Sequence, residues 1–276
     1  MNHDLPKKVT LTEVGPRDGF QFEKRMIPTA MKVEIINDLV AAGLKHIQVA
    51  SFVNPSRVPQ MADAEEVIKR LPESEGLTFS GLVLNTRGVR RALEAGLNHV
   101  EISLSASDTH SRKNAGQGFD RALGGMKEMI QLARAEAMVV RAGIQCAFGC
   151  VYEGHVSPER IVGLVQYYVS QQVDAIALSD TTGMANPVAI KQMLQIVMSE
   201  CGNIPIVLHL HDTRWLGLAN LMAALACGVN QLDTAMAGMG GCPFVAGAAG
   251  NIATIYNHMD PQRDQSYVYD DQDRLI

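Results

Sequence analysis

The chain alternates short runs rich in β-branched residues with amphipathic segments along almost its whole length. Eight of these runs read as β-strands, and their starts are about 32 residues apart, close to the roughly 31 residues per unit of a (β/α)8 barrel. A doubly wound sheet usually has fewer strands, and no Gly-x-Gly-x-x-Gly sequence follows the first run. The spacing therefore predicts an α/β protein with a (β/α)8 TIM barrel. The expected strands cover residues 9–14, 46–51, 79–84, 99–105, 140–145, 174–179, 206–211 and 231–234.

Helical patterns lie between these runs. Residues 29–42 place Met31, Ile35, Ile36 and Leu39 on one face, which we expect to pack on the barrel. Ser157-Pro158 and Asn186-Pro187 each combine a capping residue with a proline in the first turn, and therefore predict two helix starts.

Composition narrows the class of protein further. Hydrophobic residues make up 47% of the 276 residues and charged residues 19%, which excludes a disordered or fibrous chain. No linker divides the chain, so we expect one barrel domain over residues 1–276, with an irregular or truncated tail from about residue 259. No apolar run reaches the ~18–20 residues that span a bilayer, and the N-terminus lacks a signal-peptide pattern.

Charge and cysteine content indicate the partners and the compartment. The net charge is −5 and no basic stripe is present, which argues against nucleic acid as a partner. The five cysteines are scattered and odd in number, as in a reduced cytoplasmic protein, and we expect most of them to be small core residues. A homodimer or a larger homo-oligomer is the expected assembly.

Polar residues collect where the expected strands end, which in such a barrel is the catalytic face. His209 and His211 are two apart on a strand, so both imidazoles point to the same side, and Asp18 at the end of the first strand lies within reach. Two imidazoles with oxygen ligands suit Mg²⁺ or Mn²⁺. The alternative is one histidine in the core and the other on the surface.

Two further features mark this face. Arg17 lies between Gly15 and Gly19 and either pairs with Asp18 as a simple ion pair or holds a substrate oxygen that gains negative charge. Cys242 lies in a glycine-rich loop typical of a lid, where a thiol can carry a proton or be inert.

Taken in order, these motifs resemble the hydroxymethylglutaryl-CoA lyase family, a branch of the metal-dependent lyase and Claisen synthase barrels. The resemblance covers about residues 9 to 254. It rests on the segments Val14-Gly15-Pro16-Arg17-Asp18-Gly19, Ser51-Phe52-Val53-Asn54-Pro55, Cys146-Ala147-Phe148-Gly149-Cys150, Asp180-Thr181, His209-Leu210-His211-Asp212-Thr213, Gly240-Gly241-Cys242-Pro243 and Gly250-Asn251.

The resemblance implies a barrel that cleaves a 3-hydroxyacyl-CoA thioester to acetyl-CoA and a keto acid by retro-Claisen chemistry. A divalent metal, Mg²⁺ or Mn²⁺, would be held by Asp18, His209, His211 and Asn251. Arg17 would stabilise the enolate, Cys242 would shuttle a proton, and Asp180 would accept a hydrogen bond. The catalytic set is then Arg17, Asp18, His209, Cys242 and Asp180, and the expected substrate contacts are Arg17, Gln21, Gln48 and Thr181.

Three positions depart from the family pattern. Gln48 stands where the family has a glutamate, Arg214-Trp215 where it has tyrosine and glycine, and Ile255-Tyr256 where it has two acids. An amide at position 48 carries no charge, so we expect Arg17 to be less tightly held and the substrate preference to move from hydroxymethylglutaryl-CoA toward a related thioester.

Two other functions fit parts of the pattern. A Claisen synthase of the isopropylmalate synthase branch also uses an Arg-Asp-Gly strand end and paired histidines, but usually lacks the Gly-Gly-Cys-Pro loop. A paralogue that binds acyl-CoA without catalysis would explain Gln48, although it would not need the other site residues.

Overall fold

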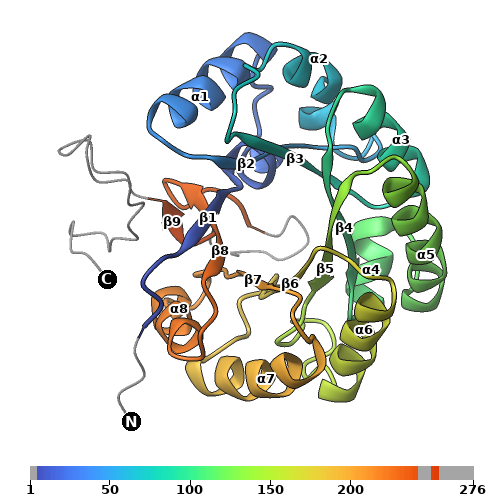
Figure 1. Ribbon diagram of the computed structural model, residues 1–276, viewed down its shortest axis with the longest axis vertical. Helices are drawn as coiled ribbons and strands as arrows, with labels where there is room; N and C mark the ends of the chain where they lie inside the picture. The colour runs from blue at the N-terminus through green and yellow to red at the C-terminus, as the bar shows by residue number, and fades with distance from the viewer. Residues whose placement is uncertain (1–4, 242–249, 255–276) are drawn as a thin grey trace.

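The chain folds into a closed parallel barrel, shown in a computed structural model that describes residues 5–241 and 250–254. Within these residues each strand pairs in parallel with the next along the chain, and β1 also pairs with β8, which closes the ring (Figure 1). The predicted (β/α)8 barrel is confirmed. Its strands are β1 (Thr10–Glu13), β2 (His46–Ser51), β3 (Thr78–Val83), β4 (His99–Ser105), β5 (Val139–Gln145), β6 (Ala175–Ser179), β7 (Ile206–His209) and β8 (Gln231–Met236), and a short β9 (Ala253–Thr254) pairs with β8.

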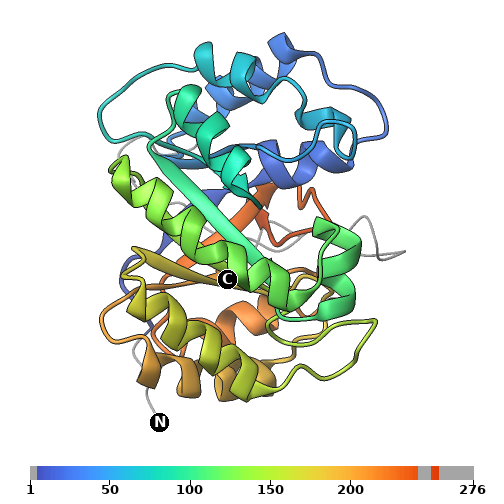
Figure 2. The same cartoon turned by 90° about the vertical axis from the view of Figure 1, so that its right-hand side faces the viewer.

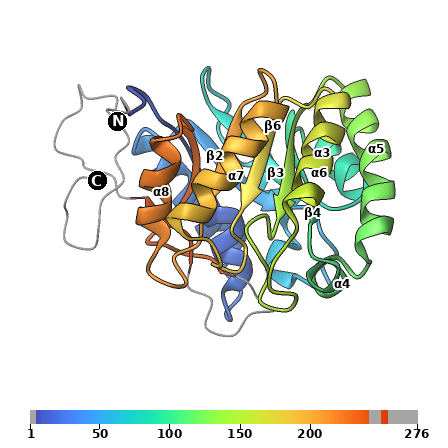
Figure 3. The same ribbon diagram turned by 90° about the horizontal axis from the view of Figure 1, so that it is seen from below.

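Helices surround the barrel, and α5 lies across the outer side of β4 (Figure 2). On another side α7 packs between α6 and α8 (Figure 3). The helices therefore cover the outer face of the barrel, and most strand residues are buried. The helices are α1 (Thr29–Ala41), α2 (Ala64–Lys69), α3 (Thr86–Glu94), α4 (Asp108–Ala115), α5 (Phe119–Ala135), α6 (Pro158–Ser170), α7 (Pro187–Glu200) and α8 (Gly217–Leu225), with short turns η1 (Gly15–Gly19), η2 (Phe20–Phe22) and η3 (Pro59–Met61).

The sequence located the elements well. All eight predicted strands are present, with ends within two residues of those expected. The two predicted helix starts are also confirmed, since Ser157 Oγ accepts from Arg160 N at 3.4 Å and Asn186 Oδ1 accepts from two backbone N–H groups at 3.0 Å. Among the described residues, no helix combines the length and the apolar character required to cross a membrane.

The inner face of α1 differs from the prediction. Ile36 is fully buried, but Met31 is 50% exposed, and Lys32 takes the buried position. The Lys32 ammonium bonds Asp63 Oδ1 at 2.6 Å and the Gln60 carbonyl oxygen, so the cost of burying its charge is offset by two partners. A hydrophobicity pattern cannot anticipate this exchange, because the partners come from a loop about 30 residues away.

The cysteines fit the expectation of core residues. Cys146, Cys150 and Cys201 are buried and Cys227 is partly buried, and none of these four is in a disulfide. The predicted tail from about residue 259 lies outside the described residues.

His110 on α4 supplies a stability prediction. It is 1% exposed, and burial lowers its pKa to about 4, with the Glu153 charge only partly opposing this. Between pH 6.5 and 4 the unfolded chain binds a proton at this histidine that the folded chain does not, so unfolding becomes easier as the pH falls, by about 1.4 kcal/mol per unit. The stability is retained above pH 6.5 and its loss is complete below pH 4.

The test is urea unfolding at pH 7 and at pH 4.5. Between pH 7 and pH 4.5, the free energy of unfolding of His110→Asn should fall by about 2–3 kcal/mol less than that of the wild type. The exposed residue His155 provides the control, and His155→Asn should lose as much as the wild type. Equal losses in all three proteins would contradict the assignment to His110.

Candidate active site

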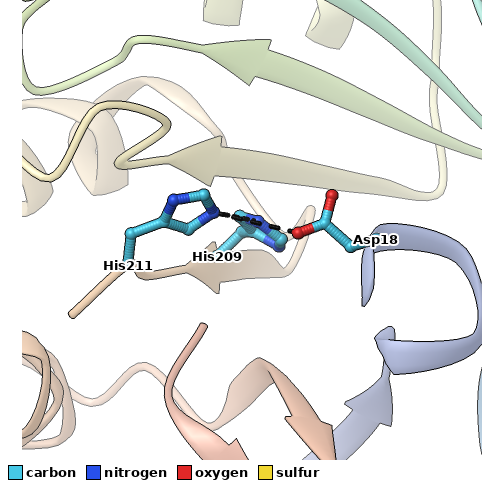
Figure 4. A group of neighbouring side chains, drawn as sticks. All are labelled: Asp18, His209 and His211. Atoms are coloured by element: carbon cyan, nitrogen blue, oxygen red, sulfur yellow. Dashed lines mark hydrogen bonds and ion pairs between the residues drawn. The ribbon is translucent and has the colours of Figure 1, made fainter. Parts of the chain in front are cut away.

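Three buried side chains meet at the carboxyl ends of the strands. Asp18 comes from η1, the turn after β1, while His209 ends β7 and His211 follows two residues later. One ligand atom from each lies within 4.8 Å of the other two (Figure 4). Both predictions about this group are confirmed, because the imidazoles point to the same side and Asp18 reaches them across β8.

The two histidines contact each other and neighbouring carboxylates. His209 Nδ1 lies 3.0 Å from Asp233 Oδ2, a contact that orients the ring. The two Nε2 atoms are 3.0 Å apart, and His211 Nε2 is 4.0 Å from Asp18 Oδ2. Burial, more than the nearby His209, lowers the pKa of His211 to about 3, which keeps that ring neutral.

Asn251 lies beside this group and holds Asp18. Its Nδ2 donates to Asp18 Oδ2 at 2.7 Å and to the Met239 carbonyl oxygen at 2.9 Å. Its Oδ1 is buried and has no hydrogen-bond partner among the described residues. A buried carbonyl oxygen normally has a partner, and a cation would supply one. Gly240 leaves the necessary space, since a Cβ there would collide with Asn251 Nδ2 and Asp18 Oδ2.

Arg17 borders the group and is only 6% exposed. Its Nη1 pairs with Asp18 Oδ1, and its Nε donates to Gln48 Oε1. Burial alone would raise the pKa of Asp18, but the Arg17 guanidinium, the two histidines and the Asn251 hydrogen bond together outweigh it and lower that pKa. Gln21 Nε2 donates to the same Asp18 oxygen at 3.3 Å.

Gln48 does contact Arg17, and the expectation that it holds Arg17 less tightly than a glutamate would stays a prediction. The carboxamide oxygen of Gln48 accepts the Nε–H of Arg17, as a carboxylate oxygen would. Loss of charge at position 48 did not remove the hydrogen bond, because a glutamine keeps one acceptor oxygen of the right reach.

Asp180 and Thr181 lie at the end of β6. The Asp180 backbone N–H donates to the His209 carbonyl oxygen at 2.8 Å, and its Oδ1 accepts from Met184 N and Ala185 N at 2.7 and 3.0 Å. Burial raises the pKa of Asp180 to about 7. Thr181 Oγ1 accepts from Cys146 N at 2.9 Å. These side chains hold the loops after β5 and β6, and their predicted part in the chemistry stays a prediction.

Comparison with known proteins places the chain in a family. A family model described as HMGL-like matches residues 8–260. The chain belongs to this family.

The alignments with similar proteins cover most of the chain. It is 40% identical over 250 residues to the mitochondrial hydroxymethylglutaryl-CoA lyase of Bos taurus, an alignment that covers 91% of this chain and 77% of the relative. The crystal structure of the Bacillus subtilis HMG-CoA lyase superposes with a TM-score of 0.86 at 38% identity and covers 90% of this chain and 84% of the other. For the Pseudomonas aeruginosa lyase the TM-score is 0.85 at 38% identity, covering 90% and 83%.

Some predicted positions of this HMGL-like protein fall outside the described residues, namely Cys242, Ile255 and Tyr256. Arg214, another departure from the family pattern, lies at the catalytic face as expected. Its Nη1 donates to the Thr182 carbonyl oxygen at 3.1 Å and to the Gly183 carbonyl oxygen, which ties the loop after β7 to the loop after β6. Trp215 beside it is 83% exposed.

The sequence interpretation missed three charged residues inside this HMGL-like barrel. Glu101, Arg141 and Asp233 lie on β4, β5 and β8, and their side chains are joined to one another by hydrogen bonds. A charged residue within an otherwise apolar, fully buried strand was the available signal, because burying a charge requires a partner.

Proposed function

We propose that the protein is a divalent-metal-dependent carbon–carbon lyase that cleaves 3-hydroxy-3-methylglutaryl-CoA to acetyl-CoA and acetoacetate. The observation that carries this proposal is the meeting of Asp18, His209 and His211 beside a buried arginine at the catalytic face of the barrel. The names of the relatives support the same substrate, since they are hydroxymethylglutaryl-CoA lyases.

The donor atoms fit a divalent cation. Asp18, His209, His211 and the unpartnered Oδ1 of Asn251 would hold it, and their two nitrogens and two oxygens suit Mg²⁺ or Mn²⁺. Such an ion, when bound, supplies a Lewis acid that lowers the pKa of a coordinated hydroxyl group. Asp233 orients His209 from behind, a contact that raises the basicity of a ligating imidazole.

The residues of the chain would divide the rest of the reaction. Loss of the proton from the tertiary hydroxyl of the substrate turns that carbon into the ketone of acetoacetate, and the broken carbon–carbon bond leaves its electron pair on acetyl-CoA as an enolate. Arg17 would stabilise the enolate oxygen, because its guanidinium is fixed beforehand by Asp18 and Gln48. Cys242 would shuttle the proton that the enolate carbon takes up, while Gln21, Gln48 and Thr181 would border the substrate and Asp180 would hold the neighbouring loop.

The structure changes our choice of substrate. The preference for a related thioester was predicted from a less tightly held Arg17, but Arg17 keeps hydrogen bonds on two sides and the relatives are hydroxymethylglutaryl-CoA lyases. We therefore propose hydroxymethylglutaryl-CoA itself. The cytoplasmic compartment and the homo-oligomer stay predictions.

The experiment is incubation of the purified, Mg²⁺-loaded protein with hydroxymethylglutaryl-CoA and with a panel of other 3-hydroxyacyl-CoA thioesters, with acetyl-CoA quantified by chromatography. We expect hydroxymethylglutaryl-CoA to give the highest kcat/KM. A higher value for another thioester would overturn the substrate, and no acetyl-CoA from any of them would overturn the lyase.

Cys242→Ala tests the proton shuttle. The variant should fold and bind Mn²⁺ like the wild type but turn over about 10²-fold more slowly, at the lower end of what general acid–base catalysis contributes. Alkylation should inactivate the native protein, and Cys227→Ala is the matched control, because Cys227 lies between the end of α8 and the start of β8, at the end of the barrel opposite the strand ends of the site. Wild-type turnover in Cys242→Ala would show that this thiol has no part in the reaction.

A further inference from the structure

A continuous row of hydrogen-bonded side chains runs through the barrel interior, from the arginine of the site to its first histidine. Its members come from the turn η1 and from strands β2, β4, β5, β7 and β8, and each is almost fully buried except Arg141, which is partly buried. In order they are Arg17, Gln48, Glu101, Arg141, Asp233 and His209.

Gln48 is the uncharged member, and its orientation is fixed by its two neighbours. Its Oε1 accepts from Arg17 Nε, and its Nε2 donates to Glu101 Oε2 at 2.9 Å. An arginine can only donate and an ionised carboxylate can only accept, so only one orientation of the amide satisfies both. A carboxylate at position 48 could still accept from Arg17 but would have nothing to donate to Glu101.

Glu101 is itself held firmly. The oxygen that accepts from Gln48 also accepts from Arg141 Nε at 2.9 Å and from Arg141 Nη2. Gly143 on β5 makes room for this carboxylate, since a Cβ there would lie 2.7 Å from Glu101 Oε1. Arg141 in turn bonds both oxygens of Asp233, at 2.8 and 2.6 Å. Burial would lower the pKa of Arg141, but Asp233 and Glu101 raise it above its ordinary value, so the guanidinium keeps its charge.

We propose that Glu101 is a positioning residue for Arg17 and acts on it through the Gln48 amide. Glu101 fixes the NH₂ group of Gln48, and Gln48 therefore presents its oxygen to Arg17 Nε. The guanidinium is thus held by Nε and Nη1, and no hydrogen bond to its Nη2 is found among the described residues, which leaves that group for the enolate oxygen. This inference rests on the proposed function, because it assigns the role of Arg17 in that reaction.

Exchanging the two side chains tests the proposal. Gln48→Glu places two carboxylates where a 2.9 Å hydrogen bond was, so we expect kcat to fall by roughly 10–100-fold, the loss typical of a missing outer hydrogen-bond partner. In the double variant Gln48→Glu/Glu101→Gln, the new carboxylate accepts from Arg17 and from the new amide at position 101, whose oxygen accepts from Arg141. In the wild type Glu101 Oε2 alone accepts from both Gln48 and Arg141, so the new amide must turn to serve both neighbours. We therefore expect kcat of the double variant to rise above that of Gln48→Glu without reaching the wild-type value.

Two measurements separate positioning from a general structural effect. Mn²⁺ affinity should stay within a few-fold in all variants, because Asn251 and Gln21 also hold Asp18. The NMR signal of the Arg17 Nε–H should be protected from exchange in the wild type and the double variant, and less protected in Gln48→Glu, where the carboxylate at position 48 receives no hydrogen bond that fixes it to position 101. Gln48→Met, an uncharged variant of similar size, should lose the signal and kcat as well, and it replaces Gln48→Glu if that protein does not fold.

Gln166→Glu is the matched control. Gln166 Nε2 donates to Glu200 Oε2 at 2.8 Å on the exposed outer side of α6 and α7, so the same substitution creates the same carboxylate pair far from Arg17. Its kcat should equal that of the wild type.

The outcomes distinguish this proposal from the proposed function. The role of Glu101 would be overturned if Gln48→Met kept the wild-type kcat and an unchanged Arg17 signal. It would also be overturned if kcat of the double variant were no higher than that of Gln48→Glu. A wild type that cleaves no thioester would overturn the lyase instead, and the Arg17 Nε–H signals alone would then decide whether Glu101 positions Arg17.

Discussion

Chelation of the divalent cation should abolish cleavage, and added Mg²⁺ or Mn²⁺ should restore it. The physical reason is that the substrate hydroxyl must lose its proton near neutral pH, and a Lewis acid contributes several kcal/mol to that step, or roughly 10³-fold or more in rate. Acetyl-CoA formation before and after metal removal measures the effect. Full activity in a metal-stripped sample would contradict the proposed lyase.

His211→Ala separates the metal site from the reaction. The variant loses one of the donors that lie within 4.8 Å of one another, so its affinity for Mn²⁺ should fall by more than the roughly 10–100-fold caused by loss of an outer partner. Titration calorimetry on metal-free protein measures the Mn²⁺ affinity without any substrate. His155→Ala, at an exposed position, is the control and should bind Mn²⁺ like the wild type. Equal Mn²⁺ affinity in His211→Ala and the wild type would remove His211 from the ligand set.

Arg17→Gln should lower kcat/KM by about 10³-fold, the upper part of the range for loss of one oxyanion donor. Arg17→Lys should recover little of this, because a single ammonium cannot bond Gln48, Asp18 and the substrate in the geometry of a guanidinium. The affinity for Mn²⁺ should not fall in Arg17→Gln, since the substitution removes a positive charge beside a cation site.

Steady-state kinetics and calorimetry on the same preparations provide the test. The exposed Arg112 supplies a control, and Arg112→Gln should retain the wild-type kcat/KM. If Arg17→Gln lost Mn²⁺ binding in parallel with activity, Arg17 would be needed for the metal site and its assignment to the enolate would be wrong.

The sequence predicted the barrel because its signal is local and repeated. Each strand is a short apolar run at a regular interval, and the polar residues of the site follow those runs directly. His209 and His211 could be placed on one side from the two-residue period alone, and Asp18 from the adjacency of β1, β8 and β7 in a closed barrel. Asn251 came from the family resemblance, and the structure places its amide nitrogen 2.7 Å from Asp18.

The interior of the barrel could not be predicted in the same way. Whether Gln48 meets Glu101 depends on how strands β2 and β4 tilt and how far each side chain reaches, and neither quantity is visible in a one-dimensional pattern. The effect of Gln48 on Arg17 was therefore predicted from charge alone, and the hydrogen bond between them was not anticipated. The burial of Lys32 was missed for a related reason, because its partners Asp63 and Gln60 belong to a segment after β2 that only the folded chain brings near.

The candidate metal ligands also occupy a special place along the chain. Asp18 follows the first strand of the barrel, while His209, His211 and Asn251 follow its seventh and eighth strands, 233 residues separating Asp18 from Asn251. They meet at the seam where β1 joins β8. A chain under synthesis therefore cannot complete the site until its last strand is available, and partial chains carry no assembled metal centre. A bound ion would act as a clasp on that seam and would stabilise the closed ring over forms in which its two ends have parted.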